Sequence, residues 1–248
     1  MNKLKLIIIE IFKKINVFWL KKFKFKKFEI DLVKKSLKYN FCTTSESILL
    51  NNISIFNKIK KNLFKGSIVE CGVEGGISLV FFHNLLVCHN INNINIYGFD
   101  TFEGVPEPKK YDLATNNTPM LEQYNKRLNP DGSSGWNNVS LDDVKNNIKT
   151  NTNNVNKILL IKGKVEDTLL NEQNIPDKIS ILKIDVNLYD GTKIILEKIF
   201  KKIHKGGVLI VDNYGTYMGI KKAVDEFFFD KKYKFNYSFF TRRLIIYI

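Results

Sequence analysis

The chain has 248 residues, of which 44% are hydrophobic and 26% charged, and its net charge is +14. This composition fits a globular domain with a substantial core and excludes a disordered chain. A basic chain suggests nucleic acid, a membrane surface or an anionic substrate, but lysine, asparagine and isoleucine are abundant throughout, so charge is weak evidence for a partner. The three cysteines, Cys42, Cys71 and Cys88, lack a metal or redox spacing and favour a reduced, cytoplasmic setting.

Residues 1–28 combine apolar side chains at helical spacing with interspersed lysines. The longest uncharged apolar run is far shorter than the ~20 residues that a membrane span requires, and no signal-peptide cleavage site follows it. We expect a helix that contacts an anionic membrane surface, its own domain or a second subunit in a homo-oligomer. Residues 1–42 are therefore predicted as a helical extension and residues 43–248 as the main domain.

The stretch Ile68–Gly76 is predicted to be a strand, a glycine turn and the start of a helix. Thr43, Thr44 and Ser45 precede it as candidate N-cap residues of an earlier helix. Glycines such as Gly72 and Gly75 let a backbone approach a ligand closely, as in nucleotide-binding βα turns. Many tight βα turns carry glycine without any ligand, so this motif alone is weak.

Acidic residues end three predicted strands. Asp100 follows the strand 95–99, Asp185 follows the strand 179–184, and Asp212 with Asn213 follows the strand 208–211. In an open parallel sheet the carboxyl ends of the strands border one crevice, and a carboxylate after the second strand is placed to accept hydrogen bonds from a ribose. Asp and Asn also end strands because they favour turns, but three such endings in one chain favour a site.

The remaining elements complete an α/β pattern. Residues 101–136 are polar and show no regular spacing of apolar residues, as expected of a lid or a binding loop. The other predicted elements are a helix that begins at a Ser140–Asp143 capping box, a strand at 157–161, a helix at 188–203, a turn at Gly206–Gly207, a helix at 219–229 and a terminal hairpin formed by 233–239 and 244–248.

Five ordered motifs carry a resemblance to a known family. They are Val69-Glu70-Cys71-Gly72-Val73-x-x-Gly-Gly, Phe99-Asp100-Thr101-Phe102-Glu103-Gly104-Val105-Pro106, Lys162-Gly163-x-x-Glu166-Asp167-Thr168-Leu169, Asp185-x-Asn187-Leu188-Tyr189 and Val211-Asp212-Asn213-Tyr214-Gly215. Over about residues 43–229 the chain resembles the macrocin O-methyltransferase family. The resemblance implies a Rossmann-like class I methyltransferase with a seven-stranded, mostly parallel sheet and helices on both faces. It also implies metal-assisted transfer of a methyl group from S-adenosylmethionine to a sugar hydroxyl.

The resemblance also assigns roles to residues. It places Glu70, Gly72 and Gly75 at the methionine part of the cofactor, Asp100 at the ribose, Gly163, Lys164 and Glu166 at the adenine, Thr44 in a segment that closes over the cofactor, and Asp185, Asp212 and Asn213 at the metal. Carboxylate and amide oxygens suit a hard cation such as Mg²⁺, which lowers the pKa of a coordinated hydroxyl and orients it. The acceptor is expected to be a sugar in a surface glycan or a glycosylated metabolite.

The chain departs from the family pattern at the general base. Family members use a lid histidine, whereas His83, His89 and His204 all lie outside the lid and are expected on helix surfaces. Asp185 or the lid residue Asp112 is then the candidate proton acceptor.

Asn187 and Asn213 stand where aspartates are common in the family. Two other classes of function stay open, a nicotinamide dinucleotide-dependent oxidoreductase and a non-catalytic nucleic-acid-binding protein. No base-stacking module supports the second, so no nucleic-acid partner is expected.

Overall fold

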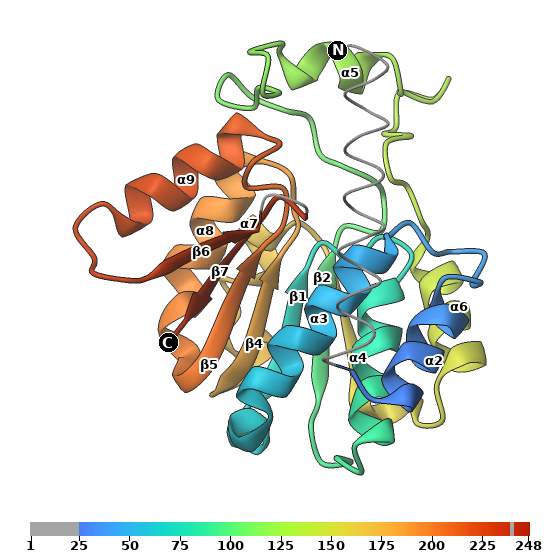
Figure 1. The fold of residues 1–248 in the computed structure, drawn as a ribbon. Helices are drawn as coiled ribbons and strands as arrows, with labels where there is room; N and C mark the ends of the chain where they lie inside the picture. Colours follow the sequence, from blue (N-terminus) through green and yellow to red (C-terminus); the bar gives the residue numbers. More distant parts are fainter. Residues whose placement is uncertain (1–24, 239–240) are drawn as a thin grey trace, which may run out of the picture.

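The computed structural model describes residues 25–238 and 241–248. Within them a seven-stranded sheet has the order β3-β2-β1-β4-β5-β7-β6 (Figure 1). β1 to β5 run parallel, and β7 is antiparallel to both β5 and β6. The strands are β1 Ser67–Cys71, β2 Ile96–Asp100, β3 Ile158–Lys162, β4 Ile179–Ile184, β5 Ile203–Val211, β6 Phe235–Ser238 and β7 Arg243–Tyr247. The predicted sheet and its terminal hairpin are thus confirmed.

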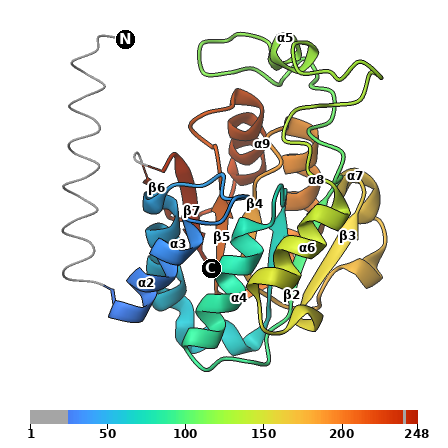
Figure 2. The ribbon, with the colours of Figure 1, turned by 90° about the vertical axis from the view of Figure 1, so that its right-hand side faces the viewer.

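Helices cover both faces of the sheet. α2, α3, α4 and α6 lie on one face and α7, α8 and α9 on the other (Figure 2). The helices are α2 Lys27–Ser36, α3 Glu46–Ile59, α4 Ile77–Cys88, α5 Met120–Asn125, α6 Leu141–Asn151, α7 Val165–Thr168, α8 Tyr189–Ile199 and α9 Met218–Phe228, with 3₁₀ turns η1 Lys60–Lys65, η2 Val155–Lys157, η3 Glu172–Asn174 and η4 Phe200–Lys202.

The central strands are buried because helices shield both of their faces. All six residues of β4 are buried, and five of them are uncharged. Successive side chains of β4 point to opposite faces of the sheet and enter two separate apolar clusters. Ile181 packs toward α3 and α4, and Leu182 packs toward α8 and α9. The exception in this strand is Lys183, a buried cation whose surroundings are described below.

Local sequence sets the helix starts. Ser45 accepts a hydrogen bond from the Ile48 amide, and Ser140 accepts one from the Asp143 amide, as expected for N-cap residues. Leu32 and Val33 of α2 are buried in the core, so the described part of the N-terminal extension packs on the main domain.

The boundary predicted at residue 42 remains a prediction. The proposed membrane helix at residues 1–28 lies mostly outside the described residues, and no helix that the structure describes is long and apolar enough to span a bilayer.

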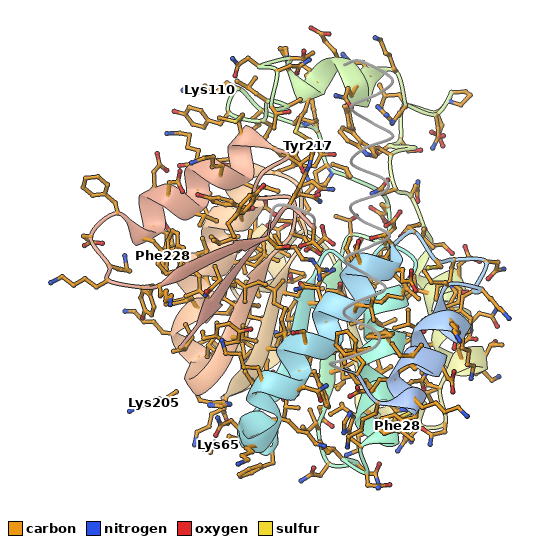
Figure 3. The ribbon with its side chains drawn as sticks, in the orientation of Figure 1. Phe28, Lys65, Lys110, Lys205, Tyr217 and Phe228 are labelled. Carbon is orange, nitrogen blue, oxygen red and sulfur yellow. The ribbon has the colours of Figure 1, made fainter. Side chains whose placement is uncertain are left out.

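A long lid joins β2 to α6 and lies over the carboxyl ends of the strands (Figure 1). Among residues 101–140 only α5 is helical, which agrees with the predicted irregular loop. The lid has a small core of its own, in which Met120 and Trp136 are buried with Val105 and Leu188. Tyr217 marks this end of the molecule, whereas Lys65 and Lys205 mark the opposite end (Figure 3).

Two predictions about elements are corrected. Gly206 and Gly207 lie within β5 rather than in a turn before it, because β5 begins at Ile203 and carries an irregularity opposite Ile179–Ile181. The helix expected to continue to residue 203 ends at Ile199 and gives way to η4.

Candidate cofactor and acceptor site

A cavity of about 290 Å³ lies at the carboxyl ends of the strands, beneath the lid. Of the predicted site residues, those that line it are Thr44, Glu70, Gly72, Asp100, Gly163, Lys164, Glu166, Asp185, Asp212 and Asn213. Gly75 is the exception. A Cβ at Gly75 would meet the Phe41 carbonyl oxygen at 3.1 Å, so this glycine admits the preceding chain segment and does not border the cavity.

The glycine turn is held in place by a carboxylate. Gly72 has a φ of 90°, and a Cβ there would lie 2.3 Å from the Asp185 carbonyl oxygen, so only glycine fits. Oδ2 of Asp100 accepts hydrogen bonds from the amides of Val73 at 2.6 Å and Glu74 at 3.1 Å. Oδ1 accepts one from the Phe102 amide at 2.8 Å. Asp100 therefore fixes the turn, a role that the sequence did not reveal.

Glu70 presents one unsatisfied oxygen. Its Oε1 accepts a hydrogen bond from the Lys183 ammonium at 2.6 Å, while its buried Oε2 has no hydrogen-bond partner among the described residues. Burial raises the pKa of Glu70, and Lys183 opposes that shift. Because buried polar atoms rarely stay unpaired, this oxygen suits a cationic ligand group such as the amino group of S-adenosylmethionine.

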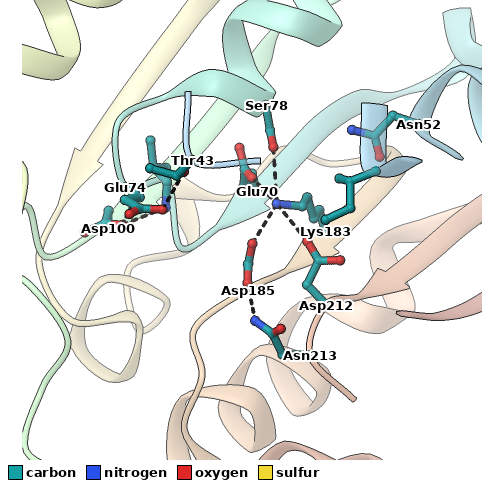
Figure 4. A network of polar contacts seen from close by, with 12 residues as sticks. Thr43, Asn52, Glu70, Glu74, Ser78, Asp100, Lys183, Asp185, Asp212 and Asn213 are labelled. Carbon is teal, nitrogen blue, oxygen red and sulfur yellow. Dashed lines mark hydrogen bonds and ion pairs between the residues drawn. The ribbon is translucent and has the colours of Figure 1, made fainter. Parts of the chain in front are cut away.

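Lys183 lies at the centre of the polar cluster (Figure 4). Its ammonium nitrogen is 2.6 Å from Glu70 Oε1, 2.8 Å from Asp185 Oδ2 and 3.0 Å from Asp212 Oδ2. Ser78 adds a fourth oxygen at 3.2 Å. Burial alone would lower the pKa of Lys183, but the carboxylates of Asp185, Glu70 and Asp212 raise it well above its ordinary value. The three carboxylates in contact with Lys183 therefore favour its charged form.

Arg243 on β7 holds the other side of Asp212. Its Nε and Nη2 contact the two oxygens of Asp212, the latter at 2.9 Å, and its Nη1 donates to Asn52 Oδ1 at 2.6 Å. Although burial would raise the pKa of Asp212, Arg243 and Lys183 hold it well below the usual range. Burial instead raises the pKa of Asp185 to about 7, against the opposing effect of Lys183.

The candidate metal ligands come together, with the amide of Asn213 between two oxygens. Its Nδ2 is 3.2 Å from Asp185 Oδ1 and 3.0 Å from Asn187 Oδ1. Asn187 and Asn213 have positive φ angles of 64° and 58°, a conformation that Asn adopts more readily than most residues. The oxygen donors of Asp185, Asp212 and Asn213 suit a hard cation chemically. However, the described residues contain no metal-binding arrangement of three or more His, Cys, Asp or Glu side chains.

The alternative proton acceptors lie elsewhere. Asp112 is buried, with Oδ1 accepting from the Tyr189 amide at 2.7 Å and Oδ2 from the Lys109 amide at 2.8 Å, so it fastens the lid to α8. The expectation that the histidines lie on helix surfaces is wrong for all three. His83 is buried against Asn153, the side chain of His89 is 2% exposed beside Glu29, and His204 lies in strand β5. None of the three histidines lines the cavity.

Lys183 and Arg243 were missed by sequence reasoning. Lys183 is the only charged residue of β4, whereas Arg243 begins β7 directly after Arg242. Lys and Arg are almost never fully buried unless they are paired, so a lysine inside a buried strand sequence was a usable signal, but an arginine at the start of a strand was not. What the sequence could not show is which carboxylates the two cations meet, because those partners come from other strands.

The strand order, the glycine turn and the acidic strand ends define a class I, Rossmann-like methyltransferase fold. Solved structures support it: the O-methyltransferase NovP matches with a TM-score of 0.70 and 21% identity, over 84% of this chain and 82% of that one. The calicheamicin methyltransferase CalS11 matches with a TM-score of 0.55 and 18% identity, over 90% and 94% of the chains. MycE methyltransferase, solved with Mg and SAH, gives a TM-score of 0.50 at 12% identity, over 88% of this chain and 53% of that one.

The chain belongs to the macrocin O-methyltransferase (TylF) family, whose model matches residues 10–236. The family predicted from the five motifs is confirmed, and the match begins well before residue 43. The chain is 26% identical to demethyldecarbamoylnovobiocin O-methyltransferase of Streptomyces niveus over 67% of its length, and 26% identical to a rhamnosyl-tetracenomycin-C 4′-O-methyltransferase of Streptomyces olivaceus over 60%. These matches span only 59% and 53% of the two relatives.

Proposed function

We propose that this protein transfers a methyl group from S-adenosylmethionine to a hydroxyl of a sugar-bearing acceptor, with help from a divalent cation. The observation that carries the proposal is a single cavity lined by Glu70, whose Oε2 is unsatisfied, and by Asp185 and Asp212, with all three carboxylates in contact with Lys183. Glu70 suits the amino group of the cofactor, and the two aspartates suit the hydroxyl of the acceptor. The family and the names of the two Streptomyces relatives support the same chemistry.

The cofactor half of the cavity consists of the glycine turn and the residues around it. Glu70 Oε2 would accept the amino group of the cofactor, Asp100 would border the ribose, and Gly163, Lys164 and Glu166 would border the adenine. Thr44 lines the cavity from the segment before α3, beside Thr43, which donates to Glu74 at 2.9 Å. When bound, S-adenosylmethionine supplies an electrophilic methyl group. The chain's own residues orient it toward the acceptor half.

The acceptor half lies between the lid and the carboxylate cluster. Val105, Pro106, Asn137, Leu188 and Tyr217 line the cavity, and we assign this largely apolar wall to the acceptor half. This combination suits a sugar ring, which has hydroxyls on its edge and C–H groups on its faces. The carrier of that sugar would be a glycosylated metabolite, as in the relatives' names, or a surface glycan.

Asp185 would take the proton of the reacting hydroxyl. Its side chain is 27% exposed, whereas that of Asp212 is 9% exposed and is paired with Arg243 and Lys183. Both oxygens of Asp212 are already bound by Arg243, so Asp185 is the carboxylate that is left to accept a proton. Asp185, Asp212 and Asn213 would hold a Mg²⁺ ion, which would lower the pKa of the hydroxyl and add positive charge near it.

Calorimetric titration of S-adenosylhomocysteine, with Mg²⁺ and then with chelator, tests the cofactor. Micromolar binding would support the proposal and justify screening sugar acceptors with a labelled methyl donor, again with and without chelator. Tight binding of NAD in place of S-adenosylhomocysteine would instead favour the oxidoreductase. Equal transfer rates with excess chelator would disprove metal assistance and leave methyl transfer intact.

A further inference from the structure

Lys183 is the one residue that contacts carboxylates in both halves of the cavity among the described residues. Its three N–H groups donate to Glu70 Oε1, Asp185 Oδ2 and Ser78 Oγ, and a fourth oxygen, Asp212 Oδ2, lies 3.0 Å away as an ion pair. Four oxygens thus compete for three hydrogens, so the hydrogen bonds of Lys183 can redistribute when the charge near any one carboxylate changes.

The sheet fixes this arrangement. Glu70 on β1 is the registered neighbour of Lys183 on β4, and Asp212 directly follows the adjacent strand β5. The Lys183 side chain is 5% exposed, so its charge cannot turn away into water. A buried cation in contact with three carboxylates stays where they are, because separating it from them would leave unpaired buried charges.

Resting on the proposed function, we propose that Lys183 is a positioning residue that couples the two halves of the cavity. Its ammonium orients Glu70 for the cofactor and Asp185 and Asp212 for the acceptor, and its charge weakens divalent-cation binding in the acceptor half. Because the same ammonium serves both halves, a ligand bound in one half changes the affinity of the other. By thermodynamic linkage the two effects are equal in size.

A purely structural Lys183 would behave differently. If it only neutralised buried carboxylates so that the chain could fold, removing its charge would destabilise the protein and weaken every ligand together. Under our proposal, removing the charge weakens the cofactor analogue but strengthens the metal. Opposite changes in the two affinities, measured on one variant, separate the two explanations.

The test is a set of titrations on the full chain. S-adenosylhomocysteine is titrated by calorimetry with and without Mn²⁺, and Mn²⁺ is titrated by the loss of its free-ion magnetic resonance signal with and without S-adenosylhomocysteine. The proteins are wild type, Lys183→Met, Lys183→Arg and the control Lys198→Met, which removes the same charge from the exposed surface of α8.

In wild type we expect each ligand to change the affinity of the other by the same factor, about threefold or more. Lys183→Met should bind Mn²⁺ about tenfold more tightly or better, because a cation in contact with two of the proposed ligands, Asp185 and Asp212, has gone. It should bind S-adenosylhomocysteine about tenfold more weakly and show little coupling. Lys183→Arg keeps the charge and should bind Mn²⁺ as wild type does. Lys198→Met should match wild type throughout.

Two results would overturn the inference. The first is unchanged or weaker Mn²⁺ binding by folded Lys183→Met. The second is independent binding of the two ligands to wild type, which decides the matter even if Lys183→Met does not fold. Failure of wild type to bind S-adenosylhomocysteine would refute the proposed function and this inference with it, whereas binding of both ligands without coupling refutes the inference alone.

Discussion

Replacing Asp100 with alanine should loosen the glycine turn as well as the cofactor. The substitution removes the acceptor of three backbone amides, two of which bind it at 2.6 and 2.8 Å. Hydrogen bonds to a charged group are worth about 1.5–3 kcal/mol each. Asp100 is only partly buried, so water can replace part of the loss. At about 1.5 kcal/mol for each of the two short bonds, we expect the free energy of unfolding to fall by about 3 kcal/mol.

Urea unfolding measures this change, and calorimetry with S-adenosylhomocysteine measures its effect on the site. We expect at least about a tenfold loss of affinity, since binding must then also order the turn. Asp100→Asn, which retains one acceptor oxygen, should lie between alanine and wild type. A loss of affinity for S-adenosylhomocysteine with less than about 0.5 kcal/mol of destabilisation would refute the reasoning, because Asp100 would then serve the ribose alone.

Three further predictions concern the cluster and the lid. Arg243→Met should lower the free energy of unfolding by about 3–5 kcal/mol in urea, because Asp212 loses its buried guanidinium; a change below about 1 kcal/mol would contradict the pairing. The pKa of Asp185 rises from 3.8 to about 7 on folding, so its contribution to stability is complete below about pH 4 and is lost as the pH rises through 7. With chelator present, the free energy of unfolding of wild type should therefore fall between about pH 4 and 7 relative to that of Asp185→Asn. Parallel pH profiles of the two free energies would contradict this prediction. Asp112→Ala should speed proteolysis within residues 101–140, whereas an altered pH profile of methyl transfer in Asp112→Asn would show that it acts as a base after all.

The sequence predicted the parts of the site that follow from strand ends. Asp185 and Asp212 border one cavity because each follows a parallel strand, and apolar strands separated by amphipathic helices leave few other arrangements. Segment boundaries were predicted less accurately where a glycine was interpreted as a turn. Gly206, for example, lies inside β5. Gly75 was assigned to the cofactor because the motif contains it, yet its neighbour is Phe41.

What the sequence could not supply is the pairing of charges. Lys183 and Asp185 are close in the chain, but the contacts of Lys183 with Glu70 and Asp212 depend on the order β1-β4-β5. Asp100 was expected to face the ribose, and its bonds to the Val73 and Glu74 amides depend on the exact course of the turn. Such contacts arise from tertiary geometry and leave no local pattern.

The position of β7 also constrains the order of events during synthesis. β6 is made before β7 but lies outside it at the edge of the sheet, so β6 has no neighbour in the described sheet until β7 exists. Arg243 begins β7, and Asp212 lacks its guanidinium until that strand reaches β5. A nascent chain that has not yet released residue 243 from the ribosome can pair its parallel strands but cannot complete the cavity. Completion of the cavity therefore waits for β7, the strand that also brings β6 into the sheet.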